Sequence, residues 1–152
     1  MNHFVGEEMK SVIIYWSRYG NGKRIVEYLS EKLKEKKVEA QLFHTDEADP
    51  KALPEADVYV FSAPTEAFSI QRNMKSFMKD LEGHDGKKYG IINTHGMKKN
   101  WLGKMEKLLS KQNMIQVAAI DFRMDGDPKT GNALPSGWEK DMDSFAESLI
   151  KT

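Results

Sequence analysis

The fold is decided by one stretch, Val12-Ile13-Ile14-Tyr15-Trp16-Ser17-Arg18-Tyr19-Gly20-Asn21-Gly22-Lys23-Arg24-Ile25-Val26. Its apolar run, 12–16, predicts a strand that is buried on both faces. Gly20 and Gly22 permit a positive φ and a close approach of the backbone. The apolar spacing that follows predicts one face of a helix, made of Ile25, Val26, Leu29 and Leu33. Because the start of a helix offers free N–H groups and a positive dipole, the stretch predicts a phosphate-binding turn.

Length and composition favour one globular domain. The chain has 152 residues, of which 39% are hydrophobic and 30% charged. We expect residues 1–10 to form a loosely ordered tail and residues 11–152 to form a single domain. No apolar run approaches the roughly 20 residues that span a bilayer, so membrane insertion is not expected. The 23 Lys and Arg balance 23 Asp and Glu, which gives no global field for nucleic acid or an anionic membrane.

The absence of cysteine limits the chemistry of the chain. It excludes a disulfide framework, a thiolate metal site and a cysteine nucleophile, and it points to the cytoplasm. The four histidines, at positions 3, 44, 84 and 95, show no metal-ligand spacing with carboxylates. No serine stands in a Gly-x-Ser-x-Gly elbow. We therefore expect no metal ligands and assign no catalytic residue.

Strand and helix patterns alternate along the whole chain. Apolar runs predict strands over 12–16, 38–44, 57–63, 88–93 and 117–122, and helical spacing predicts helices within 25–33, 74–81, 101–109 and 138–150. Asp49-Pro50 is expected to open a turn or a helical piece. The connections over 65–70, 94–100 and 125–137 read as loops. This order predicts an open parallel sheet of about five strands covered by helices on both faces, with ligands at the carboxyl ends of the strands.

Spacing separates the phosphate motifs that compete for the first loop. A P-loop needs glycine at position 17 and Ser or Thr at position 24, where this chain has Ser17 and Arg24. A dinucleotide fingerprint needs a third glycine at position 25, which is Ile25. ATP or GTP hydrolysis and NAD binding are therefore disfavoured. The pattern that remains is a single phosphate monoester held by a hydroxyl, backbone N–H groups and a helix end.

The first loop resembles that of the flavodoxins, which reads Thr or Ser, any residue, Thr or Ser, Gly, Asn, Thr. The chain offers Ser17-Arg18-Tyr19-Gly20-Asn21-Gly22, and segments 48–50, 53–57 and 61–65 are similar as well. The resemblance implies a flavodoxin-like, doubly wound five-stranded parallel sheet in a three-layer α/β/α sandwich, with FMN as cofactor. The chain departs from the pattern at Gly22, which lacks a hydroxyl that family members use on the phosphate. Tyr19 also places its hydroxyl farther from the backbone.

By the same resemblance, three loops hold the FMN. They supply Ser17, Arg18, Tyr19, Gly20, Asn21, Gly22 and Lys23; Pro64, Thr65, Glu66, Ala67 and Phe68; and Thr94, His95, Gly96 and Trp101. Aromatic side chains are expected on both sides of the flavin ring, Phe68 on one and Trp101 or His95 on the other. Trp101 fits a core position in the first turn of its helix equally well.

Charged side chains near the flavin are expected to set its redox behaviour. Glu66 would disfavour a reduced anion, whereas His95, Lys98 and Lys99 would favour it. Lys23 and Arg24 stand at a helix N-terminus, where the dipole disfavours cations unless an anion is present.

Three functions are consistent with these features. The first is an electron carrier, a monomer or weak dimer that moves electrons between a reductase and a redox partner. The second is a small FMN-dependent oxidoreductase acting on a quinone or porphyrinogen, with the turn-rich segment 125–137 as a lid. The third is a flavodoxin-like scaffold without flavin, which stays open because of Gly22 and the absence of glycine from residues 65–68.

Overall fold

The computed structural model describes residues 8–66, 69–96 and 101–151. Within them one sheet has the strand order β2-β1-β3-β5-β6, with all these neighbours parallel and a short β4 antiparallel to β3. The strands are β1 (Lys10–Tyr15), β2 (Glu39–His44), β3 (Val58–Glu66), β4 (Ser69–Ile70), β5 (Lys88–His95) and β6 (Ile115–Arg123). The helices are α1 (Asn21–Glu35), α2 (Arg72–Lys79), α3 (Leu102–Ser110) and α4 (Trp138–Ile150), with short 3-10 helices at Thr45–Glu47 and Pro128–Thr130.

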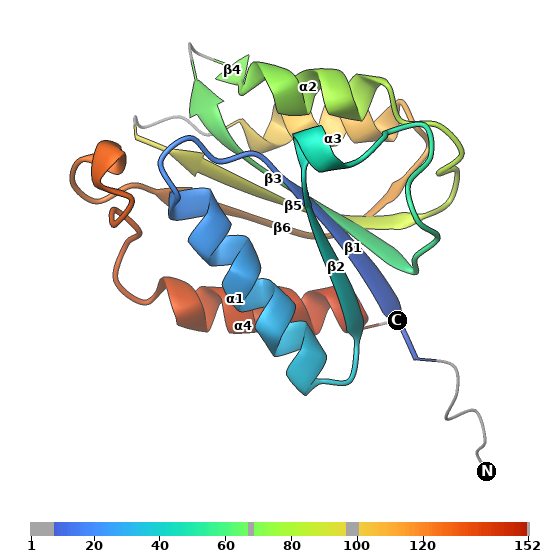
Figure 1. Ribbon diagram of the computed structural model, residues 1–152, viewed down its shortest axis with the longest axis horizontal. Helices are drawn as coiled ribbons and strands as arrows, with labels where there is room; N and C mark the ends of the chain where they lie inside the picture. Colours follow the sequence, from blue (N-terminus) through green and yellow to red (C-terminus); the bar gives the residue numbers. More distant parts are fainter. Residues whose placement is uncertain (1–7, 67–68, 97–100, 152) are drawn as a thin grey trace.

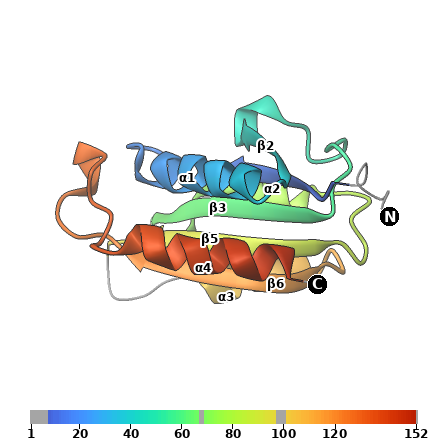
Figure 2. The same cartoon turned by 90° about the horizontal axis from the view of Figure 1, so that it is seen from below.

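Helices cover both faces of the sheet, as predicted (Figures 1 and 2). Successive residues of β1 point to opposite faces. Val12 and Ile14 pack in the core that contains α2 and α3, whereas Ile13 and Tyr15 pack in the core that contains α1 and α4. All four side chains are at least 90% buried, which confirms the prediction of a strand covered on both sides.

Three strands extend beyond their predicted ends, because the residues there pair with neighbouring strands. The backbone N–H of Lys10 donates to the Asp57 carboxylate (2.7 Å), so the first strand begins inside the predicted tail, of which residues 1–7 lie outside the described part. The region after Pro64 was expected to be a loop, but Thr65 and Glu66 continue β3 and pair with β4. Thr94 and His95 likewise continue β5, because both pair with β6.

Two buried positions show how closely the layers pack. A Cβ atom on Gly90 would lie 2.7 Å from Leu149 Cδ2 and 2.9 Å from Phe145 Cζ, so a larger residue here requires these two side chains of α4 to shift. On the other face, the His84 ring packs edge-on against Tyr59 with 4.8 Å between ring centroids. Burial lowers the pKa of His84 below its ordinary value of 6.5.

The parallel topology separates the two edges of the sheet. The carboxyl ends of the parallel strands lie at one edge, together with the first loop and the segment 125–137. At the opposite edge, β1 begins and α4 ends (Figure 1). No helix in the described part of the chain is long and apolar enough to cross a membrane.

Candidate functional site

A cavity of about 640 Å³ opens at the carboxyl ends of the strands, where the three predicted loops meet. Its lining includes most of the predicted residues: Ser17, Arg18, Tyr19, Asn21, Gly22, Pro64, Thr65, Glu66, Thr94, His95 and Gly96. Gly20, Lys23 and Trp101 do not line it, and Ala67 and Phe68 lie outside the described residues. Sequence reasoning missed three further lining residues, Trp16, Met124 and Pro128.

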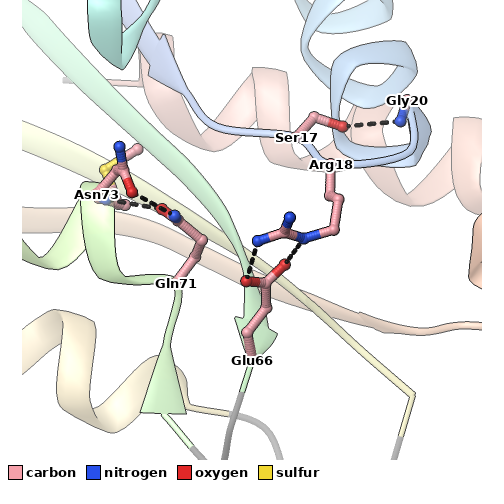
Figure 3. Close-up of polar contacts among 7 residues, drawn as sticks. Ser17, Arg18, Gly20, Glu66, Gln71 and Asn73 are labelled. Carbon is pink, nitrogen blue, oxygen red and sulfur yellow. Dashed lines mark hydrogen bonds and ion pairs between the residues drawn. The ribbon is translucent and has the colours of Figure 1, made fainter.

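The first loop forms a tight turn into α1. Gly20 has φ 101°, which confirms the expected positive φ, and its N–H donates to Ser17 Oγ over 3.1 Å (Figure 3). Gly22 does not have a positive φ, because it already belongs to α1. A Cβ on Gly22 would lie 3.6 Å from Ser17 Oγ, an ordinary van der Waals distance. Glycine is therefore required at position 20 but not at position 22.

Backbone donors remain free at the start of α1. The first helical N–H groups cannot bond within their own helix. Those of Asn21, Gly22 and Lys23 have no acceptor within the described residues, whereas the Arg24 N–H already donates to the Gly20 carbonyl. Asn21 and Gly22 also line the cavity. The arrangement suits an oxyanion at this end of the cavity.

The segment 125–137 is fastened to the first loop. Asn21 Nδ2 donates to the Pro128 carbonyl (2.9 Å), and the Ala133 N–H donates to Asn21 Oδ1 (2.9 Å). A Cβ on Gly131 would lie only 2.5 Å from the Tyr19 carbonyl oxygen. The segment thus packs directly on the backbone of the first loop.

Neither basic residue at the start of α1 is placed as the phosphate argument expected. The Arg24 guanidinium donates to Asn132 (3.1 Å) and lies 5.7 Å from the centroid of the Trp138 ring. Lys23 is exposed and does not line the cavity. Arg24 therefore has a structural role that needs no anion, because its partners come from the distant segment 125–137 and from α4.

An ion pair joins the first loop to the end of β3. Arg18 Nε and Nη2 donate to the two carboxylate oxygens of Glu66 over 2.7 and 2.8 Å (Figure 3). The guanidinium lies 4.7 Å from the centroid of the Trp16 ring, and its pKa is raised by the bond to Glu66. The sequence analysis expects the charge of Glu66 to disfavour a reduced flavin anion. The Arg18 guanidinium, which sequence reasoning did not pair with Glu66, offsets part of that charge.

Asn93 connects the other two loops, and sequence reasoning missed it. This fully buried side chain donates to the Ala63 carbonyl, and its Oδ1 accepts from Thr65 Oγ1 (3.1 Å) and from the Trp101 backbone N–H (3.0 Å). The available signal was an amide that directly follows the apolar Ile91-Ile92 of a buried strand. Asn93 fixes the walls of the cavity rather than lining it.

His95 and Trp101, the two proposed ring partners, differ in position. His95 lines the cavity and is 5% exposed; its Nδ1 lies 3.6 Å from Asp121 Oδ2 and makes no hydrogen bond within the described residues. Trp101 precedes α3 and packs against the apolar core between the sheet and helices α2 and α3. This packing favours the core interpretation of Trp101.

Comparisons with known proteins agree with this architecture. The family model described as Flavodoxin matches residues 13–141. An archaeal flavodoxin structure has 19% identity and a TM-score of 0.71, with 94% of this chain and 100% of that chain covered. A flavodoxin from Streptococcus pneumoniae TIGR4 has 18% identity and a TM-score of 0.75, with 92% and 97% covered.

The same fold occurs within a longer chain. Rubredoxin oxygen:oxidoreductase from Desulfovibrio gigas has 14% identity and a TM-score of 0.78, and the match covers 92% of this chain but only 35% of that one. A search of curated proteins gave no significant match. Because the family model spans most of the sequence, the chain belongs to the flavodoxin family, and its cofactor is FMN.

Proposed function

We propose that this protein carries electrons from a reductase to a redox partner, with FMN bound in the cavity at the carboxyl ends of the strands. The observation that carries the proposal is that the backbone N–H groups of Asn21, Gly22 and Lys23, next to the Ser17 hydroxyl, have no acceptor among the residues that the structure describes. A phosphate monoester satisfies such donors and gains from the dipole of α1.

The residues around the cavity fit the rest of the cofactor. We assign the phosphate end to the loop 17–22 and the flavin ring to the space between Pro64–Glu66 and Thr94–Gly96. The Nδ1 of His95 supports this assignment, since this buried nitrogen makes no hydrogen bond within the described residues, with Asp121 Oδ2 3.6 Å away, and a polar group of FMN would supply one. When bound, FMN supplies one-electron and two-electron redox chemistry.

The placement of the segment 125–137 favours a carrier over an oxidoreductase with a quinone or porphyrinogen substrate. An enzyme of that kind needs a pocket that excludes water above the reacting ring. In the described residues this segment packs on the first loop through Asn21 and Gly131, and only Pro128 of it lines the cavity. It therefore closes the phosphate end rather than the ring end. We further propose a monomer or weak dimer in the cytoplasm, bound to neither nucleic acid nor membrane.

Titration of the cofactor-free protein with FMN tests the site. We expect quenching of flavin fluorescence and a shifted visible spectrum for the wild type, and loss of both in Gly20→Val, because valine strongly disfavours φ 101°. Gly83→Val is the matched control, since Gly83 also has a positive φ (78°) but lies far from the cavity. No uptake by the wild type at micromolar FMN would favour the scaffold hypothesis. Normal uptake by Gly20→Val would refute the loop assignment.

A further inference from the structure

Positive charge is concentrated on the outer surface of α2 and α3. Residues 69–79 and 101–111 contain six cations and one carboxylate, Glu106. We call the six the basic surface: Arg72, Lys75, Lys79, Lys104, Lys107 and Lys111. In the opposite layer, residues 138–150 of α4 carry four carboxylates and one lysine, whereas residues 21–35 of α1 carry four cations and three carboxylates. A chain with a formal net charge of zero is therefore strongly asymmetric.

The cations of the basic surface repel one another. Some other lysines pair with acids, as Lys36 does with Glu147 and Lys87 does with Glu55. Among residues 8–66, 69–96 and 101–151, no carboxylate lies within 4.0 Å of any of the six cations. The pKa of Lys75 is lowered below its ordinary value, chiefly by the Lys104 ammonium group. The arrangement therefore does not serve folding stability.

Two of the six cations lie at helix starts, where the helix dipole disfavours positive charge. Arg72 is the first residue of α2 and Lys104 lies in the first turn of α3, and neither helix has an acidic residue in its first turn. The dipole at a helix start favours acids and disfavours cations. By contrast, α4 has Glu139 and Asp141 in its first turn. Local stability would favour carboxylates on α2 and α3, and the chain has cations instead.

The basic surface begins at the rim of the candidate cofactor cavity. A second recess, of about 430 Å³, is lined by Ser69, Arg72 and Lys75 and shares Trp16, Arg18 and Glu66 with that cavity. The Ser69 hydroxyl is buried there without a hydrogen-bond partner in the described residues. Gln71 holds the start of α2 in place, because its side chain accepts from the Met74 N–H over 2.9 Å (Figure 3).

We propose that the basic surface docks an acidic redox protein, with a carboxylate of that partner in the recess beside Arg72 and Lys75. The inference rests on the proposed function, because docking here brings the partner against the rim of the cofactor cavity. Screening acts over about 10 Å at 0.1 M salt, so a partner at this surface responds to the local cations rather than to the zero net charge.

Two forms of one acceptor test the sign of the charge. Cytochrome c is basic, whereas succinylated cytochrome c carries carboxylates in place of its lysine charges. Reduced FMN passes one electron to each ferric haem, which becomes ferrous, and stopped-flow absorbance follows the reaction. Between about 10 and about 200 mM salt, we expect the rate with the succinylated form to fall about tenfold and the rate with the native form to rise.

Charge reversal then assigns the effect to the surface. Lys75→Glu/Lys104→Glu leaves four cations against three carboxylates on α2 and α3, so both salt dependences should become much weaker. Lys34→Glu/Lys151→Glu is the matched control, with the same change in net charge at the far edge of the fold, and it should keep the wild-type salt dependences. Equal salt dependences for the two double variants would overturn the proposal.

A binding measurement separates this proposal from the proposed function. Succinylated cytochrome c added to the ¹⁵N-labelled protein should shift amide signals of α2 and α3, whether or not FMN is present. Shifts there without FMN uptake would refute the carrier function and leave the docking surface standing. Shifts confined to α1 and α4 would refute the docking surface alone. Preferential shifts at the same helices with duplex DNA or with phosphatidylserine vesicles would also overturn the choice of a protein partner.

Discussion

Replacing Asn21 should release the segment 125–137 from the first loop. In the wild type the Asn21 amide makes two hydrogen bonds of 2.9 Å to backbone groups more than 100 residues away, and it is 6% exposed. Each bond contributes about 0.5–1.5 kcal/mol, and a buried N–H left without an acceptor costs about 1–3 kcal/mol. Ala133, whose N–H is the donor, is 1% exposed. We therefore expect Asn21→Ala to lose about 2–4 kcal/mol of folding free energy.

A second substitution at the same position separates the two bonds. Asn21→Asp keeps an acceptor for the Ala133 N–H but has no donor for the Pro128 carbonyl. Its carboxylate also gains about 0.3–1 kcal/mol from the dipole of α1. The loss should therefore be about half that of Asn21→Ala. Lys129→Ala is the control on the segment itself, because the Lys129 side chain is exposed and makes no hydrogen bond or ion pair within the described residues, so stability should change by less than about 0.5 kcal/mol.

Urea unfolding followed by far-ultraviolet circular dichroism measures these differences without FMN, so that cofactor affinity does not contribute. Hydrogen exchange at the Ala133 amide reports the local opening directly. The reasoning is refuted if Asn21→Ala keeps both the wild-type urea midpoint and the wild-type protection of that amide.

Three more predictions follow from the packing and the site. Gly22→Thr adds a hydroxyl where a Cβ has room and should tighten FMN binding about tenfold in a fluorescence titration; an unchanged Kd would contradict this. Gly90→Ala places a methyl group against Leu149 and Phe145 and should cost about 1–3 kcal/mol, so a wild-type melting temperature would count against the packing. Burial lowers the pKa of His84, so the unfolded chain binds a proton more readily than the folded one, and the free energy of unfolding should fall as the pH drops below about 6.5. His84→Gln should flatten that pH dependence, which urea titrations at several pH values measure.

The sequence predicts the layers of the fold well because they depend on local patterns. Apolar runs such as Ile13-Ile14 identify strands that are buried on both faces, and right-handed crossovers then set the order of the sheet. Gly20 belongs to the same class, since its positive φ follows from one glycine in a tight turn. These features need no knowledge of distant partners.

The contacts that shape the site depend on residues that meet only in three dimensions. Pro64 suggests a loop, yet the pairing of Glu66 with Ser69 continues the strand. Arg24 was expected to lie near a bound anion, but its guanidinium donates to Asn132 instead. The concentration of positive charge on α2 and α3 could not be predicted for a similar reason, because a net charge of zero does not show which helices share a face.

The edge opposite the cavity has a practical use. Since β1 begins and α4 ends at this edge, groups attached to the described ends of these two elements would leave the cavity uncovered. Affinity tags, fluorophores and surface tethers can therefore be introduced there. Immobilisation through this edge would present the cavity to the solution.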